Sequence, residues 1–212
     1  MNHNRALISL FDYTGNASRP YKEAGWNVIR IDIQHGVDIM KWDYIRWYQS
    51  LEYYSTLPEV GIIAMVPCTD YALSGAKHFK GKDSDGRTEQ SQKLLAKTKE
   101  IIDFFDDIRV LRFWQIENPM SRIHSLNPWM GKPKIKFDPC DYAGYDPVPD
   151  NSNYRKKTWL WGKFNIPEPL RMLPKTKEYP GFKNLGGKSL KTKNLRSITP
   201  LGFAYAFYHA NK

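Results

Sequence analysis

The first half of the chain alternates between short apolar runs and segments with helical spacing. Residues 6–11 (A-L-I-S-L-F) and 60–66 (V-G-I-I-A-M-V) are continuous apolar runs, which predict buried strands. Residues 26–33 alternate between apolar and polar positions, and residues 110–116 form another apolar run, so both predict strands. Apolar residues recur at helical spacing between residues 88 and 107. This rhythm predicts an α/β fold, with a mainly parallel sheet covered by helices.

The composition changes after residue 118, where proline, glycine, lysine and aromatic residues become frequent. Local patterns predict further helices at residues 19–24, 42–54 and 199–210, and a strand at residues 158–162. We therefore expect a core made of residues 1–120 and 197–212, and a loop-rich basic region made of residues 121–196.

The charge distribution indicates a polyanionic partner. The 212 residues carry a net charge of +10, and 41% of them are hydrophobic, which suffices for a packed core. Between Arg155 and Arg196 there are twelve basic residues against two acidic ones, Glu168 and Glu178. A basic concentration of this kind is typical of nucleic-acid binding, and a merely solvated basic face is the alternative.

Several classes of protein are not expected from this sequence. It has no run of about 18 apolar residues, and its polar N-terminus predicts no signal peptide. Only two cysteines occur, Cys68 and Cys140, too few for a tetrahedral cysteine zinc site and no sign of an oxidising compartment. The histidines lack metal-ligand spacing, so we expect no metal and no membrane, and Cys140 is expected to be structural.

Polar residues follow the first two predicted strands. The turn F-D-Y-T-G-N-A-S contains Gly15, which lets the backbone approach a ligand closely, and Asp32 ends the second strand. Asp38 is a further acceptor nearby in the sequence. Because ligands of doubly wound sheets bind at the carboxyl ends of the strands, these residues form a candidate cofactor site. The alternative is an ordinary turn with solvated aspartates.

Reactive side chains follow the third and fourth predicted strands. Cys68 comes directly after Pro67, where a thiolate would lie at the carboxyl edge of the sheet, although a small packed residue is the alternative. Glu117, in E-N-P, is a candidate general acid or simply a solvated strand end. Residues 154–162 (Y-R-K-K-T-W-L-W-G) suit phosphate or base contacts, or an edge strand protected by lysines.

Taken in order, these segments resemble the DNA (cytosine-5) methyltransferase family, especially its small phage-type members. F-D-Y-T-G-N (residues 11–16) resembles the first S-adenosylmethionine motif, and V-P-C-T (66–69) the Pro-Cys nucleophile motif. I-E-N-P (116–119) is similar to the Glu-Asn-Val motif, and R-K-K-T-W-L-W-G (155–162) to a diverged arginine motif. R-S-I-T-P-L-G-F-A-Y-A-F (196–207) is similar to the last motif, whose helix completes the cofactor pocket. The resemblance covers almost the whole chain.

The resemblance implies a Rossmann-like methyltransferase that uses S-adenosylmethionine to methylate C5 of cytosine in DNA. Cys68 would attack C6 of a flipped-out cytosine, Glu117 would act at N3, and Arg155 and Lys157 would hold the base and a neighbouring phosphate. The implied cofactor-binding residues are Phe11, Tyr13, Thr14, Gly15, Asp32, Ile33, Asp38, Ile39 and Pro67. The expected DNA contacts are Ser74, Lys77, Lys156, Lys163, Lys188, Lys191 and Lys193.

The chain departs from the family pattern at several positions. Tyr13 replaces the first motif glycine, Thr69 replaces the usual glutamine, and lysines stand where arginines are usual. Only about 30 residues separate Gly162 from Arg196, too few for a large target-recognition domain, so we expect short or lax specificity and salt-sensitive binding. We expect a cytoplasmic monomer of bacterial or phage origin. A catalytically weakened relative, a nucleic-acid-binding module and another pyrimidine modification remain alternatives.

Overall fold

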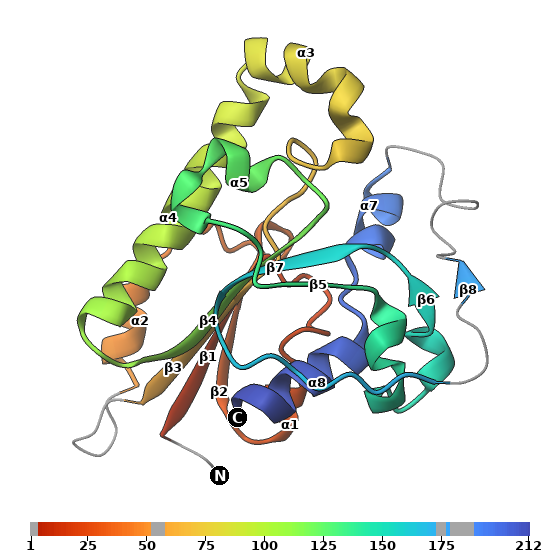
Figure 1. Cartoon of the computed structure of the whole chain (residues 1–212). Helices are drawn as coiled ribbons and strands as arrows, with labels where there is room; N and C mark the ends of the chain where they lie inside the picture. The colour runs from red at the N-terminus through yellow and green to blue at the C-terminus, as the bar shows by residue number, and fades with distance from the viewer. Residues whose placement is uncertain (1–3, 52–57, 173–176, 179–188) are drawn as a thin grey trace.

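A six-stranded sheet forms the centre of the molecule (Figure 1). The computed structural model describes residues 4–51, 58–172, 177–178 and 189–212. The strands of the sheet are β1 (Arg5–Leu10), β2 (Asn27–Ile31), β3 (Glu59–Ala64), β4 (Leu111–Pro119), β5 (Ile135–Phe137) and β7 (Thr158–Lys163). Apolar or alternating segments of the sequence form each of the five longer strands, as the pattern predicts.

The strand order is β2-β1-β3-β4-β7-β5. The first four strands in this order are parallel to one another, whereas β7 runs antiparallel to both β4 and β5. The carboxyl ends of β1 to β4 therefore share one edge of the sheet with the amino end of β7. The expected α/β fold is confirmed as a mostly parallel, mixed sheet, and it is compatible with a Rossmann-like fold.

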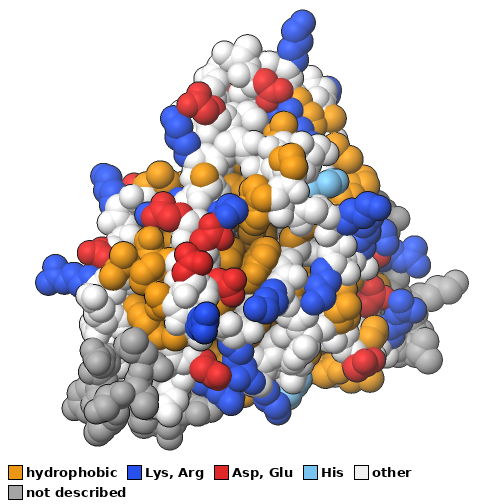
Figure 2. Space-filling model, turned by 60° about the vertical axis from the view of Figure 1, so that its left-hand side comes forward, with side chains coloured by type: hydrophobic (Ala, Val, Ile, Leu, Met, Phe, Trp, Pro, Cys, Tyr) orange, Lys and Arg blue, Asp and Glu red, His pale blue; other side chains and the backbone are white. Residues whose placement is uncertain are grey.

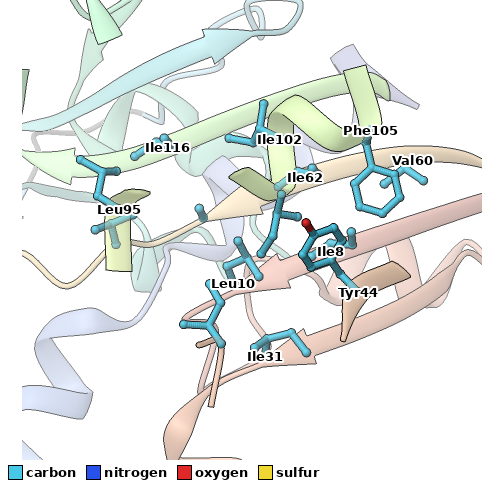
Figure 3. Close-up of a cluster of buried hydrophobic side chains, with 14 of the residues drawn as sticks. Ile8, Leu10, Ile31, Tyr44, Val60, Ile62, Leu95, Ile102, Phe105 and Ile116 are labelled. Atoms are coloured by element: carbon cyan, nitrogen blue, oxygen red, sulfur yellow. The ribbon is translucent and has the colours of Figure 1, made fainter. Parts of the chain in front are cut away.

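Helices cover both faces of the sheet and enclose two hydrophobic clusters. On one face lie α2 (Tyr44–Gln49) and α4 (Arg87–Asp107), packed on strand residues such as Ile8 and Ile62 (Figure 3). On the other face lie α1 (Arg19–Glu23) and α8 (Leu201–Asn211). Successive strand residues point to opposite faces, which is why buried strands are apolar almost continuously.

Shorter elements fill the connections. They are η1 (Ile33–His35), η2 (Leu73–His78), α3 (Phe79–Ser84), α5 (Ile123–Leu126), η3 (Pro128–Met130), η4 (Pro139–Tyr145), η5 (Pro149–Asn151) and α7 (Leu190–Ser197), with β6 (Tyr154–Arg155) pairing β8 (Lys177–Glu178). The predicted helix at residues 42–54 is shorter, because α2 ends at Gln49, and residues 52–54 lie outside the described part of the chain.

Two strands of the main sheet, β5 and β7, come from the region expected to be loop-rich. The sheet is therefore not confined to residues 1–120, and the lysine-rich segment around β7 is built onto the edge strand of the parallel part. Among the described residues, no helix is both long and apolar enough to cross a membrane.

Candidate functional site

The turn between β1 and α1 is organised by Asp12, a residue that the sequence reasoning missed. Asp12 is buried, and its carboxylate accepts hydrogen bonds from the Ser9 hydroxyl, the Gly15 amide, and both the amide and the hydroxyl of Ser18. Gly15 has φ +76°, and a Cβ atom there would lie 2.6 Å from Nη1 of Arg30. An aspartate directly after a strand and three residues before a glycine was the available signal, because short carboxylates bond nearby backbone amides.

Tyr13 and Thr14 lie at the exposed outer rim of this turn. The Tyr13 ring stacks on His35 with a centroid distance of 5.2 Å, and the Tyr13 carbonyl accepts a hydrogen bond of 3.2 Å from Arg30 Nη1. Phe11, half-buried beneath them, has φ +59°, which is unusual for a residue other than glycine. Tyr13 therefore packs against η1.

The residues after β2 divide between surface and core. Asp32 is buried, and its Oδ1 accepts a hydrogen bond of 2.8 Å from the Gln34 amide at the start of η1. Ile33 is 70% exposed, whereas Ile39 is only 4% exposed and packs in the core. Asp38 accepts a hydrogen bond from the Met40 amide. The structure thus brings Asp32 and Ile33 to the same edge as the β1–α1 turn, but it places Ile39 beneath the surface.

The Cys68 turn follows β3 at this edge. Met65 and Val66 are buried, whereas Pro67 and Cys68 are exposed. The Cys68 carbonyl accepts hydrogen bonds from the amides of Tyr71 and Ala72, which closes a tight turn. The thiol therefore lies where the chain leaves the buried strand and reaches solvent. Hydrogen bonds to the Cys68 carbonyl hold the backbone of this turn.

Several charged groups act on the Cys68 thiol. Burial raises its pKa, the nearby carboxylate of Glu117 raises that pKa further, and Lys156 and Arg196 lower it. Solvent nevertheless reaches the side chain. The Cys68 thiol is therefore accessible from solvent and lies within the influence of an acid and two cations.

Glu117 lies near the end of β4, on the face of the sheet that α8 covers. It is half-buried and lines a cavity of about 20 Å³ together with residues such as Met65, Thr199 and Phe203. Burial raises the pKa of the Glu117 carboxyl, and Lys156 opposes this effect. A carboxyl with a raised pKa holds its proton closer to neutral pH, as a general acid requires.

Asn118 links the two reactive segments. It is fully buried, and its Nδ2 donates a hydrogen bond of 3.0 Å to the carbonyl of Val66, two residues before Cys68. The asparagine of E-N-P therefore ties the end of β4 to the segment that carries the thiol. Sequence reasoning treated this asparagine as part of a motif only, and the buried bond gives it a physical role.

Of the three consecutive basic residues after Tyr154, Lys156 is the one that acts on both Cys68 and Glu117. Its Nζ donates a hydrogen bond of 2.8 Å to the carbonyl of Arg196. Arg155 instead lowers the pKa of the Cys140 thiol, and Lys157 forms an ion pair of 2.5 Å with Asp138. Lys156 and Arg196 are thus the cations that act on the Cys68 thiol, and the expected role of Arg155 and Lys157 in holding the base and a phosphate stays a prediction.

The other expected DNA contacts that the structure describes come from three elements. Ser74 and Lys77 are exposed on η2, and Lys191 and Lys193 are exposed on α7. Lys163 lies at the far end of β7, beside Asp106 at 3.6 Å, so the structure does not bring it to the carboxyl edge. Lys188 lies outside the described residues.

Helix α7 is joined to η1, the short helix that follows β2. The side-chain amides of Asn194 and Gln34 exchange two hydrogen bonds, of 2.8 and 3.1 Å, which join α7 to η1. Asn16 of the first turn donates to the carbonyl of Thr199, just before α8. The last motif of the sequence therefore lies against the first one, as the resemblance implies.

A larger hollow, of about 480 Å³, lies elsewhere, on the surface of α2 and α4 (Figure 2). Apolar and acidic side chains gather there, among them Tyr44, Trp129, Glu100 and Asp103. It contains none of the predicted site residues. Within the part of the chain that the structure describes, no cluster of three or more histidine, cysteine or acidic residues is arranged to hold a metal ion.

Comparison with known proteins adds no family to this geometry. No protein-family model matches the chain, and no curated protein matches it either. The features that bear on function are therefore the residues at the carboxyl edge and the charges around Cys68 and Glu117.

Proposed function

We propose that the protein methylates C5 of cytosine in DNA, using S-adenosylmethionine, on a Rossmann-like methyltransferase fold. The observation that supports this most is an accessible cysteine in the turn after β3 beside a carboxyl on β4 whose own pKa is raised by burial, at one sheet edge. Two cations, Lys156 and Arg196, act on the same thiol. A nucleophile, an acid and neighbouring cations are what covalent activation of a pyrimidine needs.

In this mechanism the Cys68 sulfur forms a bond to C6 of the cytosine ring. Glu117 supplies a proton or a hydrogen bond to N3, so that the electron pair displaced from the C5–C6 double bond is stabilised and C5 becomes nucleophilic. After C5 gains a methyl group, a base removes the C5 proton, the electron pair of that C–H bond restores the C5–C6 double bond, and the C6–S bond breaks to release the thiolate. The base must leave the DNA stack, because neither C5 nor C6 is accessible within it.

The Cys68 thiol must lose its proton before it attacks. Lys156 and Arg196 favour the thiolate, whereas burial and Glu117 disfavour it. A protonated Glu117 can act as a general acid. It also carries no negative charge, so it no longer raises the pKa of the Cys68 thiol. Lys156 lowers the pKa of both the Cys68 thiol and the Glu117 carboxyl, and we propose that it sets the protonation of the two groups together.

The residues at the β1–α1 turn and after β2 fit S-adenosylmethionine. The carboxylate of Asp32 would accept hydrogen bonds from ribose hydroxyls, and exposed Ile33 offers an apolar surface to the adenine ring. The turn from Phe11 to Gly15, held by Asp12, would lie against the remaining part of the cofactor. When bound, the cofactor would supply the electrophilic methyl group.

The basic residues around the edge are proposed to bind the DNA backbone. Lys77, Lys191 and Lys193 are exposed on two elements that lie beside the candidate site. Phosphate contacts of this kind carry no sequence information and weaken with salt. We therefore propose binding with modest sequence preference and steep salt dependence.

The experiment that tests the proposal is transfer of a labelled methyl group from S-adenosylmethionine to unmodified DNA, followed by nucleoside mass spectrometry. The expected product is 5-methylcytosine, and it should be absent when Cys68 is replaced by serine. A labelled nucleoside other than 5-methylcytosine, or no labelled nucleoside at all, would refute the proposed reaction.

A catalytically weakened relative that binds DNA without turnover is the second candidate. It is favoured by the surroundings of Cys68, where burial and Glu117 raise the pKa of the thiol and so disfavour the reactive thiolate. Salt-sensitive DNA binding without any methylated nucleoside would select this reading over the enzyme.

A further inference from the structure

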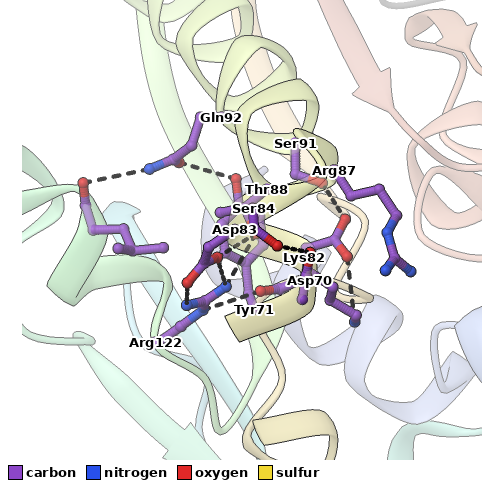
Figure 4. Close-up of polar contacts among 12 residues, drawn as sticks. Asp70, Tyr71, Lys82, Asp83, Ser84, Arg87, Thr88, Ser91, Gln92 and Arg122 are labelled. Carbon is purple, nitrogen blue, oxygen red and sulfur yellow. Dashed lines mark hydrogen bonds and ion pairs between the residues drawn. The ribbon is translucent and has the colours of Figure 1, made fainter. Parts of the chain in front are cut away.

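Two charged side chains from other segments, the buried Lys82 and the half-buried Arg122, bind the turn that carries Cys68 (Figure 4). Asp70, two residues after the cysteine, is only 8% exposed, and Lys82 of α3 is only 6% exposed. Lysine and aspartate are rarely buried to this extent without a partner. Their burial directly beside the proposed nucleophile calls for a physical reason.

Lys82 holds the turn from the side of α3. Its Nζ donates a hydrogen bond to the carbonyl of Thr69 and lies 3.2 Å from Oδ1 of Asp70. Ser91 of α4 donates a hydrogen bond of 2.6 Å to the other oxygen of the same carboxylate. The two residues that follow Cys68 are therefore fixed through both a main-chain carbonyl and a side chain.

Arg122, three residues after β4, holds the turn from the opposite side. Its Nε donates to the carbonyl of Asp70 at 3.1 Å, and its two terminal nitrogens bind the carboxylate of Asp83 at 2.9 and 2.6 Å. The guanidinium also stacks on the Phe79 ring, 3.7 Å from its centroid. This forked geometry is specific to arginine.

The main chain adds to the same connection. The Arg122 amide donates to the carbonyl of Tyr71, and the Leu73 amide donates to the carbonyl of Met120. Strand β4 carries Glu117. The segment that follows this strand is therefore joined to the Cys68 turn by backbone hydrogen bonds and by the Arg122 side chain.

The energetics of buried ion pairs indicates that Lys82 and Arg122 position the turn more than they stabilise the fold. Burying an ion pair costs desolvation energy that its mutual attraction often fails to recover, so an apolar pair of the same size would serve stability as well. Here each cation binds a carbonyl of the residues directly after Cys68, an interaction that an apolar side chain cannot replace.

We propose that Lys82 and Arg122 are positioning residues that fix the Cys68 turn relative to Glu117 before any DNA binds. The expected effect on the rate of methyl transfer rests on the proposed function. The rigidity of the turn does not, because it can be measured in the free protein. The clamp makes the turn rigid in the free protein, so that cytosine meets a nucleophile that is already placed.

The decisive variant is the double substitution Lys82→Met with Asp70→Asn. Lys82→Met alone leaves a buried carboxylate without its cation and risks unfolding the protein. The double variant removes both charges while keeping side-chain size. The matched control is Lys93→Met with Glu89→Gln, which removes an exposed ion pair of the same charges from α4.

Hydrogen exchange in the free protein measures the clamp without reference to catalysis. The amides of Tyr71 and Ala72 bind the Cys68 carbonyl, so their exchange reports the turn directly. We expect about tenfold faster exchange, or more, in the double variant, with unchanged exchange in the middle of α4 and no change in the control. Unchanged exchange of the turn in a folded double variant would overturn the proposal.

Steady-state kinetics then separates positioning from a general loss of structure. We expect the double variant to show a kcat about tenfold lower with an unchanged KM for DNA, because the base still binds but meets a misplaced thiol. Arg122→Lys, which keeps the charge but loses the fork, should lower kcat less than Arg122→Met. Faster exchange with an unchanged kcat would refute a positioning role. If the wild-type protein transfers no methyl group, the proposed function fails, and the exchange measurement still decides whether the clamp fixes the turn.

Discussion

The chain contains two Pro-Cys turns whose local sequences are nearly the same, P-C-T-D-Y around Cys68 and P-C-D-Y around Cys140. The first follows a central parallel strand, and solvent reaches its thiol. The second starts η4, after the edge strand β5, and its thiol is buried. Tertiary surroundings, and not the dipeptide, therefore separate a candidate nucleophile from a packed residue.

The charged neighbours of the two thiols differ in the same way. The Cys140 pKa is raised by burial and by Asp141 and Asp138, but both carboxylates are already engaged, with Arg171 and Lys157 respectively. Glu117, beside Cys68, has a raised pKa of its own and lines a small cavity. A carboxyl that holds its proton can act as an acid, whereas a carboxylate held in an ion pair cannot.

Replacing the two cysteines should give the largest contrast. Cys68→Ser is expected to reduce methyl transfer to background, because the serine hydroxyl is a far weaker nucleophile, while folding and DNA binding persist. Cys140→Ser should keep the wild-type rate within about twofold, since a buried thiol has no part in the reaction. Methyl-transfer rates with a DNA-binding control measure both, and turnover by Cys68→Ser would contradict the contrast.

Replacing the carboxyl beside each thiol should give the next largest contrast. Glu117→Gln is expected to slow methyl transfer by about 10²–10⁴-fold, the usual worth of a general acid, without weakening DNA binding. Asp141→Asn should change the rate less than about twofold, because that carboxylate only caps η4 and pairs with Arg171. Single-turnover rates at saturating DNA separate these outcomes, and an equal effect of both changes would remove Glu117 from the mechanism.

Alkylation by iodoacetamide compares the thiols without any substrate. Cys68 should react at least about tenfold faster than Cys140, because solvent reaches it. Since Glu117 raises the pKa of the Cys68 thiol and Lys156 lowers it, Glu117→Gln should move the alkylation profile of Cys68 to lower pH, and Lys156→Met should move it to higher pH. Peptide mapping by mass spectrometry assigns each site, and parallel shifts at Cys140 would show that the effect is not local.

The smallest effect concerns stability. Burial raises the pKa of Glu117 in the folded protein above its value in the unfolded chain. The stability that this protonation contributes is present below the unfolded value and is lost as the pH rises through the folded one. Glutamine does not titrate, so the Tm of Glu117→Gln relative to the wild type should increase from about pH 4 to about pH 8. Calorimetry measures this trend. A difference in Tm between the variant and the wild type that does not change with pH would mean that Glu117 is not buried in solution.

Most of the sheet could be predicted from the sequence because buried parallel strands are apolar runs. The strands β1, β2, β3, β4 and β7 were all expected near their observed positions, and so were α4 and α8. The short elements η2, α3, α5 and α7 were not expected, because polar segments of this length gain their structure from tertiary contacts. Lys82, for example, joins α3 to the Cys68 turn by contacts that no periodicity reveals.

The candidate site was predictable in part for a similar reason. The carboxyl ends of parallel strands share an edge, so topology alone brings Cys68, Glu117 and Asp32 to the same side of the sheet. The roles of Asp12, Asn118 and Arg196 depend on buried hydrogen bonds and on a distant helix, which residue types do not reveal. The sequence could not show which of the consecutive basic residues acts on Cys68, because that depends on side-chain direction.

The most direct test of the account is covalent trapping on DNA that contains 5-fluorocytosine. Fluorine at C5 blocks the final proton loss, so a cysteine that attacks C6 stays bonded to the base after methyl transfer. We expect a complex that survives denaturation, requires S-adenosylmethionine and maps to the peptide containing Cys68. The Cys140→Ser variant should still form this complex. The absence of a stable complex with bound DNA, or an adduct at any other residue, would contradict the assignment of Cys68 as the nucleophile.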